Sequence, residues 1–169
     1  MTPKTPKESL TILTDLVLPG ETNPLNNLFG GELLARMDRA SSIAAHRHCR
    51  AIAVTASVNH VAFSKAVPVG SVLIIEAKVS RAFTSSMEIY LDVWMEHRMS
   101  GEKTKVNEAI YTFVAVDLSG TPIKVPDLIP ETDLEKERYE GALRRKQLSL
   151  VLSKKMKPSE ATELKALFA

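Results

Sequence analysis

The sequence predicts an α+β domain in which one antiparallel β-sheet covers a single long α-helix, with a helical extension at the C-terminus. One helical segment, residues 31–48, follows a glycine pair and lies between a first strand and four consecutive strand-like segments. Those four segments alternate apolar and polar side chains, which is the period of a half-buried strand. A single long helix can bury its apolar side only against such a sheet.

The first strand is expected over residues 9–18, which mix β-branched and apolar residues and stop at Pro19-Gly20. A loop rich in amide side chains follows and closes on Gly30-Gly31, where the helix begins. At 100° per residue, one stripe of this helix is apolar and made mostly of small side chains. The stripe consists of Leu33, Met37, Ala40, Ala44 and His48. Asp38 falls at its margin, so we expect that carboxylate to be half-buried or at a rim.

The four later strands and the tail follow from the same reasoning. Strands are expected over residues 51–62, 71–82, 87–98 and 105–118, and helices from Thr132 or Asp133 to about Lys154 and over residues 159–168. We divide the chain into a domain of residues 1–125 and a helical tail of residues 126–169. Long strands with one helix leave such a domain poorly closed, so we expect it to dimerise through a sheet edge or beside the helix.

Composition narrows the class of protein. With 169 residues, 44% of them hydrophobic and 25% charged, the chain has the size and composition of one soluble globular domain. A net charge of +2 does not indicate a nucleic-acid partner, although Arg144-Arg145-Lys146 concentrates basic charge near the end. The single cysteine, Cys49, excludes an intrachain disulfide and a cysteine-based zinc site. Without an apolar leader or an 18-residue apolar stretch, a cytoplasmic protein with no membrane association is predicted.

Few chemical motifs stand out. The sequence has no P-loop, dinucleotide fingerprint, nucleophile elbow or His-Glu-Xaa-Xaa-His, and its four histidines lack ligand spacing, so we predict no metal site. The start of the long helix is more informative. Its free N–H groups favour negative charge, and glycines there let a carbonyl approach closely. The plain alternative is a tight connection in which Asn23, Asn26 and Asn27 form turns.

Several short motifs, taken in order, decide between these readings. They are Thr22-Asn23, Phe29-Gly30-Gly31, Met37-Asp38, Val54-Thr55-Ala56-Ser57-Val58, Phe63 with Pro68-Val69-Gly70, and Ser85-Ser86-Met87. Over residues 8 to 120 the chain resembles the hot-dog acyl-CoA thioesterases, in the branch of the bacterial YciA-type enzymes and the cytosolic acyl-CoA thioester hydrolases of animals. Tyr139-Glu140 and Arg144-Arg145 extend the resemblance into the tail.

The resemblance implies roles for individual residues. Asn23 from one subunit and Asp38 from the other would frame the thioester, with Asn27 as a neighbouring candidate in the loop. The backbone N–H of Gly31, beside Gly30, would polarise the carbonyl, and Thr55 would hydrogen-bond to the carboxylate or to water. Asp38 would activate water as a general base or attack as a nucleophile. Because Asp38 has no cation one helical turn away, an ordinary surface ion pair is a weaker explanation.

Coenzyme A requires a slot for pantetheine and cations for its phosphates. The region that matches it in similar proteins is Asn59, His60, Arg81, Ser85 and Ser86. Lys65, Arg144 and Arg145 are candidate phosphate contacts, although the arginines fit an exposed helix face equally well. Coenzyme A would be part of substrate and product, and no bound cofactor is expected.

Two departures from the family pattern concern substrate detail. Many relatives carry an acid where Asn59 and Ser71 stand, and acyl chain length stays open. The family implies a homodimer as the minimal unit and a hexamer built as a trimer of dimers. The alternatives are a non-enzymatic acyl-CoA sensor of the same fold and a hot-dog dehydratase. The dehydratase would need a histidine opposite an acid, and neither His46 nor His60 lies in a matching motif.

Overall fold

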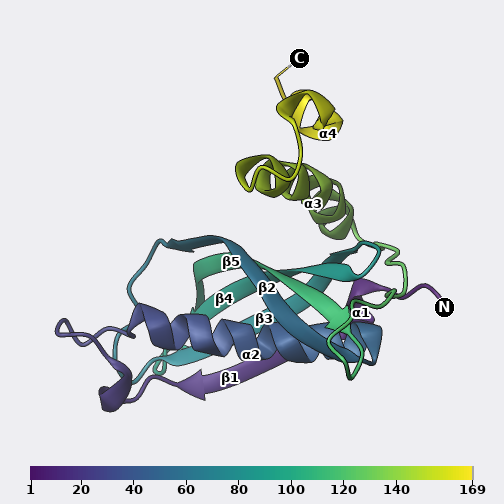
Figure 1. The fold of residues 1–169 in the computed structure, drawn as a ribbon. Coiled ribbons are helices and arrows are strands. Elements are labelled where there is room, and N and C mark those ends of the chain that lie inside the picture. The colour runs from purple at the N-terminus through teal and green to yellow at the C-terminus, as the bar shows by residue number, and fades with distance from the viewer. Residues whose placement is uncertain (169) are drawn as a thin grey trace.

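The computed structural model describes residues 1–168 and contains the predicted architecture. A five-stranded antiparallel sheet, in the order β1-β3-β4-β5-β2, curves around helix α2 (Figure 1). The strands are β1 (Thr11–Leu16), β2 (Ile52–Phe63), β3 (Val72–Ala82), β4 (Ser86–Glu96) and β5 (Lys103–Val116), and α2 spans Gly30–Cys49. The predicted α+β class and the predicted strand order along the chain are therefore confirmed.

The N-terminus differs from the prediction. Residues Pro6–Ser9 form a short helix, α1, so the strand expected over residues 9–18 begins only at Thr11. Proline fits the first helical position because its missing N–H would have no partner there. The N–H of Thr5 donates to Oε2 of Glu8 at 2.8 Å, which stabilises this turn.

The apolar stripe predicted for α2 forms the centre of the core. Met37, Ala40 and Ala44 have no exposed surface, and they pack against the concave face of the sheet. Small side chains let the strands approach the helix closely, which is the condition for wrapping a sheet around it. Arg36 lies outside the predicted stripe, yet the structure buries it to 4% exposure.

The C-terminal helix α3 (Asp133–Leu152) lies on the outer side of the sheet. Thr132 caps it as predicted, its Oγ1 accepting the N–H of Glu135 at 3.2 Å. The helix expected over residues 159–168 is instead a 3₁₀ turn, η2 (Pro158–Glu160), and a short helix, α4 (Thr162–Lys165). Ala161, with ψ at 67°, leaves the helical region and separates the two. In Figure 1, α3 lies between the sheet and α4, which is farther from the sheet.

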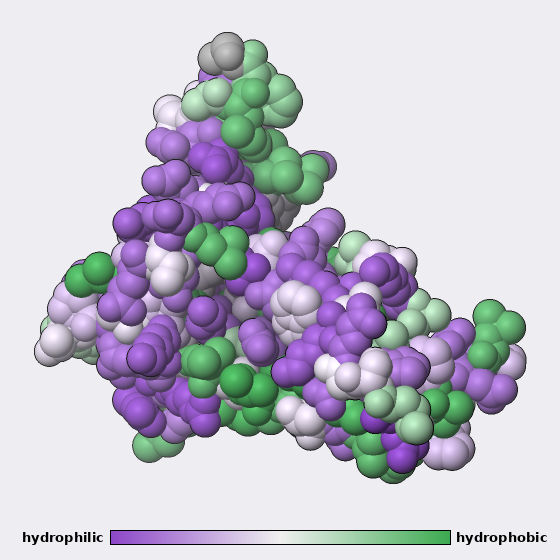
Figure 2. Space-filling view, turned by 180° about the vertical axis from the view of Figure 1, so that it is seen from behind, coloured by the Kyte–Doolittle hydropathy of each residue, from purple (hydrophilic) through white to green (hydrophobic). Residues whose placement is uncertain are grey.

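The sheet has two open edges, β1 and β2. The β2 edge carries exposed apolar side chains, namely Ile52, Val54, Val58 and Phe63. A long apolar edge of this kind is a site for pairing with another strand. Figure 2 shows a second group of hydrophobic side chains on the C-terminal tail, where Leu152, Leu167 and Phe168 are exposed. Among residues 1–168, none of the helices combines the length and apolar character needed to cross a membrane.

Candidate functional site

The carboxylate of Asp38 is held by a hydroxyl from the neighbouring strand. Oγ1 of Thr55, on β2, donates to Oδ1 of Asp38, on α2, at 2.7 Å. Asp38 is half-buried and Thr55 is exposed. Hydrogen bonds to an ionised acceptor are stronger than neutral ones, so this contact fixes the orientation of the carboxylate. It joins two residues that sequence analysis placed in one site.

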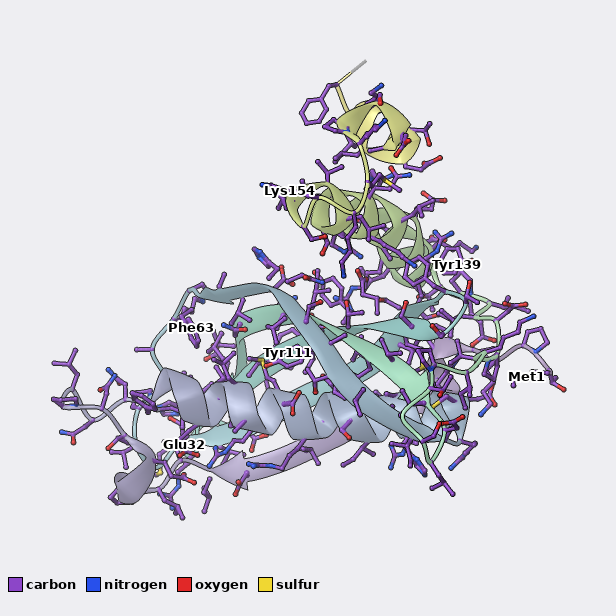
Figure 3. All side chains as sticks on the ribbon, viewed as in Figure 1. Met1, Glu32, Phe63, Tyr111, Tyr139 and Lys154 are labelled. Atoms are coloured by element: carbon purple, nitrogen blue, oxygen red, sulfur yellow. The ribbon has the colours of Figure 1, made fainter. Side chains whose placement is uncertain are left out.

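A cavity of about 510 Å³ opens beside this pair. Asp38, Asn59 and His60 are its polar residues, and the remaining lining is mainly apolar. The apolar lining consists of Leu34, Ala35, Val58, Val61, Phe63 and Tyr111. In Figure 3, Phe63 lies near the start of α2, and Tyr111, on β5, lies over a later part of that helix. A carboxylate at the rim of an apolar cavity suits a substrate with a reactive group on a hydrocarbon chain.

Tyr111 was not predicted as part of the site. Its Oη donates to the carbonyl oxygen of Leu34 at 3.1 Å, and its ring is buried. Burial, and secondarily the charge of Asp38, raises the pKa of Tyr111 to about 12, so the phenol is neutral in the physiological range. In the sequence it is one apolar position of an alternating strand, which gives no signal of its place beside an acid.

The start of α2 is free of side-chain caps. Glu32 and Leu33 donate their N–H groups to the carbonyl oxygen of Phe29, whereas within residues 1–168 the N–H groups of Gly30 and Gly31 have no hydrogen-bond partner. A Cβ on Gly30 would lie 3.3 Å from the ring of Phe63, so a side chain there would displace a cavity residue. Gly31 is exposed, and its N–H can therefore meet an oxygen of a bound molecule.

The amide loop, residues 18–29, holds Asn23 through its own backbone. Oδ1 of Asn23 accepts the N–H groups of Leu25 at 2.9 Å and Asn27 at 3.2 Å. This side chain therefore forms a turn, as expected if the loop were only a tight connection. Its Nδ2 group has no partner in the described part of the chain. The side chain thus stabilises the loop with one end and keeps a donor at the other.

One chain does not bring all of these groups together. Asp38 lies seven residues after Gly31 on α2, which is about 10 Å along the axis at 1.5 Å per residue. A carbonyl held at Gly31 would be too far from that carboxylate for a single water to bridge them. Within one chain, the glycine start and the carboxylate are therefore separate.

The strand beside Asp38 is irregular. The pairing of β2 with β5 shifts register between Thr55 and Ser57 and again between Val58 and His60. Bulges of this kind redirect side chains next to functional sites. Nδ2 of Asn59 donates to Oγ1 of Thr112 at 3.1 Å, and His60 lines the cavity. Lys65 is exposed just after the strand.

Two arginines among the predicted coenzyme A contacts, Arg145 and Arg81, differ in what they touch. Arg145 makes a two-point ion pair with Glu88, at 2.7 and 2.9 Å, and is occupied by it. Arg81 stacks on Tyr139, 4.2 Å from the ring centre, and donates to its carbonyl oxygen at 2.9 Å.

Lys146 lies next to these cations, 3.6 Å from the ring centre of Phe83. Burial, and secondarily the charge of Arg81, lowers the pKa of Lys146. Ser85 and Ser86 lie at the turn into β4, and Arg144 is half-buried. Across the described residues, His, Cys, Asp and Glu side chains do not gather in groups of three.

A sheet wrapped around one helix, with an acid at mid-helix and an uncapped glycine start, defines a hot-dog protein. Residues 25–102 match the family model of the Thioesterase superfamily. The chain is 41% identical over 139 residues to the uncharacterized acyl-CoA thioester hydrolase YkhA of Bacillus subtilis, covering 82% of this chain and 81% of that one. The chain belongs to the thioesterase superfamily, within its acyl-CoA thioester hydrolases.

Solved structures of similar proteins support this family assignment. A structure described as an apo-hexameric acyl-CoA thioesterase has a TM-score of 0.84 and 39% identity, covering 87% of this chain and 94% of that one. An alanine variant of an acyl-CoA hydrolase from Staphylococcus aureus, in complex with coenzyme A, has a TM-score of 0.84 and 32% identity, covering 98% and 99%.

The residues substituted in the Staphylococcus aureus enzyme can be compared with the candidate site of this chain. Its solved variants replace an asparagine, an aspartate and a threonine by alanine. The intervals between these three positions equal those between Asn23, Asp38 and Thr55.

Proposed function

We propose that this protein is an acyl-CoA thioesterase, which hydrolyses an acyl-CoA to a carboxylic acid and free coenzyme A. The observation that carries the proposal is the Thr55–Asp38 pair, with its 2.7 Å hydrogen bond, at the rim of an apolar cavity. A thioester is already activated, so its hydrolysis needs chiefly a base for water and donors for the developing oxyanion.

The chain supplies both. The N–H of Gly31 would hold the thioester oxygen, and Asn23 from the same subunit would orient water or substrate. Asp38 of the partner subunit would take a proton from the attacking water. The tetrahedral intermediate then collapses, the C–S bond breaks, and the proton on the carboxyl returns to the departing thiolate. Direct attack by Asp38, giving an anhydride, uses the same geometry.

Single-turnover hydrolysis in ¹⁸O-water tests the anhydride route. If water opens an anhydride at the Asp38 carbonyl, ¹⁸O enters the Asp38 carboxyl and the product acid takes an unlabelled oxygen from Asp38. With a general base, one ¹⁸O enters the product acid and none enters the protein. Label in the peptide that contains Asp38, measured by mass spectrometry, therefore identifies an anhydride opened at Asp38.

We propose that two copies meet through β2. Pairing the two β2 edges antiparallel would cover Val54, Val58 and the exposed Thr55, and it would bring each Asp38 toward the helix start of the other copy. The hexameric relative supports a further step, a trimer of such dimers.

We place coenzyme A around the edge strand. A second cavity of about 600 Å³ lies between β2, β5 and α3, and it shares Asn59 and His60 with the cavity of Asp38. Pantetheine would pass these two residues, and the phosphates would meet Arg81 and Lys146, which have no carboxylate partner within residues 1–168. Ser85, Ser86, Lys65 and Arg144 would be peripheral, and Glu88 already occupies Arg145.

The direct test is a panel of acyl-CoAs of increasing chain length assayed with a thiol reagent. Release of coenzyme A with a preferred chain length is the expected result. The preferred length measures the depth of the cavity around Leu34 and Phe63. Tight binding without thiol release would instead identify an acyl-CoA sensor.

A further inference from the structure

Arg36 is a buried cation that the proposed chemistry does not use. Its Nη2 donates to Oε2 of Glu21 at 2.7 Å and to the carbonyl oxygen of Leu16 at 3.3 Å. Only 5% of its side chain is exposed, and 26% of that of Glu21. The more exposed Asp15 lies 3.4 Å away and is a weaker partner. Arg36 thus links the buried side of α2 to the beginning of the amide loop.

Glu21 is the residue that closes this loop. Its Oε2 also accepts the N–H of Leu18 at 2.9 Å, and its carbonyl oxygen accepts the N–H of Phe29 at 2.9 Å. Phe29 directly precedes the glycine start of α2. Hydrogen bonds from Leu18 and Arg36 lower the pKa of Glu21, so its carboxylate stays ionised at neutral pH. Both ends of the loop are therefore fixed through one residue.

The opposite side of the loop is held to residues 67–69 by backbone hydrogen bonds. The N–H of Leu28 donates to the carbonyl oxygen of Val67 at 2.7 Å, and the N–H of Val69 donates to that of Asn26 at 2.9 Å. These bonds hold the returning half of the loop, and Asn23 is tied to that half because its N–H donates to the carbonyl oxygen of Asn27 at 2.8 Å. The leading segment, residues 18–21, is held by Glu21 and Arg36.

A contribution to the stability of the folded chain is a poor explanation for the ion pair between Arg36 and Glu21. Burying a guanidinium costs free energy, and Nη1 of Arg36 is buried without a hydrogen-bond partner in the described chain. Arg36 and Asp38 are two residues apart, so they point about 200° apart on α2. Helix α2 therefore holds the loop of its own chain through Arg36 on one side and presents Asp38 on the other.

We propose that the Arg36–Glu21 ion pair is a positioning device that fixes the amide loop, so that Asn23 and the N–H of Gly31 face Asp38 of the partner subunit. The inference rests on the proposed function. Arg36 acts through Glu21 and does not touch the substrate.

The test compares Arg36→Met and Glu21→Gln with the matched control Arg39→Met, which removes an exposed cation of the same helix. We expect kcat to fall about tenfold or more in the first two variants, because small displacements of positioning groups cost this much. KM should change less than kcat, and the double variant should be no worse than the worse single one. Arg36→Lys should recover part of kcat, and Arg39→Met should match the wild type.

Hydrogen exchange provides a readout that does not depend on activity. Amides of residues 18–29 should exchange faster in Arg36→Met and in Glu21→Gln, while those of the buried turns of α2 keep their wild-type rates. Unchanged exchange in this loop, or a kcat equal to that of Arg39→Met, would overturn the inference. If the wild type hydrolyses no acyl-CoA, the proposed function fails, and the exchange comparison still decides whether the pair fixes the loop. Glu21→Gln serves where Arg36→Met does not fold.

Discussion

At the scale of single residues, the proposed chemistry depends on the half-buried carboxylate of Asp38. The 2.7 Å hydrogen bond from Thr55 leaves Asp38 with a second oxygen free to face a water molecule. A general base must be within hydrogen-bond reach of the proton that it takes, and orientation matters as much as basicity.

Replacing Asp38 by Asn should lower kcat by about a hundredfold or more, because it removes the general base and keeps the shape of the side chain. Turnover of the preferred acyl-CoA, with oligomer size from light scattering, measures this. Glu102→Gln, in the exposed turn between β4 and β5, is the control and should retain wild-type turnover. A fully active Asp38→Asn enzyme would remove this residue from the mechanism.

Thr55→Val should have a smaller effect, about tenfold in kcat, since a hydrogen bond to a charged group contributes about 1.5 kcal/mol. Thr55→Ser keeps the hydroxyl and should restore most of the activity. Wild-type activity in Thr55→Val would show that the hydrogen bond does not contribute.

At the scale of elements, α2 contributes both to the core and to a pH response. His48 has no exposed surface and pairs with the carbonyl oxygen of Pro126 through Nε2 at 2.8 Å, while its Nδ1 is buried without a partner within residues 1–168. Burial lowers the pKa of His48 below its usual 6.5. The unfolded chain therefore binds this proton at a higher pH than the folded chain does.

This difference in pKa sets the direction in which stability changes with pH. The free energy of unfolding should be highest above pH 6.5 and should fall as the pH decreases below it, because the unfolded state then binds more protons. Urea unfolding at several pH values measures the slope. His48→Gln can keep a donor to Pro126 without titrating, so its slope between pH 7 and 5 should be shallower. Identical slopes would show that other groups cause the acid sensitivity.

Helix α3 is fixed to the sheet by charges more than by apolar packing. Glu88, only 4% exposed, accepts from Arg145, and Arg138 pairs with Asp92 at 2.8 Å. Arg145→Met should cost about 3 kcal/mol, because it leaves a buried carboxylate unpaired. Adding Glu88→Gln should recover much of this loss in thermal unfolding. Lys136→Met, which removes an exposed partner of Asp133, is the control and should change little.

Local periodicity explains which elements could be predicted. The stripe of α2 and the alternation of the four later strands are repeated many times along the chain, so each residue supports its neighbours' assignment. The position of Asp38 at the margin of that stripe could also be read from the sequence, because it depends only on helical geometry.

Other features depend on contacts between distant segments. The burial of Arg36 requires Glu21 and Leu16, which reach it from a loop, and the wheel of one helix cannot show them. The place of Tyr111 beside Asp38 depends on which strand lies over α2. The ion pair between Glu88 and Arg145 depends on where α3 packs on the sheet.

At the scale of the whole molecule, the site is expected to be shared by two chains. Mixing inactive Asn23→Ala with inactive Asp38→Ala protein, after subunit exchange, should restore activity. In each mixed dimer one site receives both wild-type residues, so random exchange should regain about a quarter of the wild-type activity. A site formed within one chain would give no recovery, because neither chain carries both residues.

The two-turn separation of Gly31 and Asp38 along α2 has a consequence for the cell. If the site is shared as proposed, a folded chain without its partner would hold only half of each site and would bind a thioester without cleaving it. Hydrolysis would then begin with assembly, and dilution alone would act as an off-switch: specific activity should decline once the enzyme concentration drops below the dimer dissociation constant.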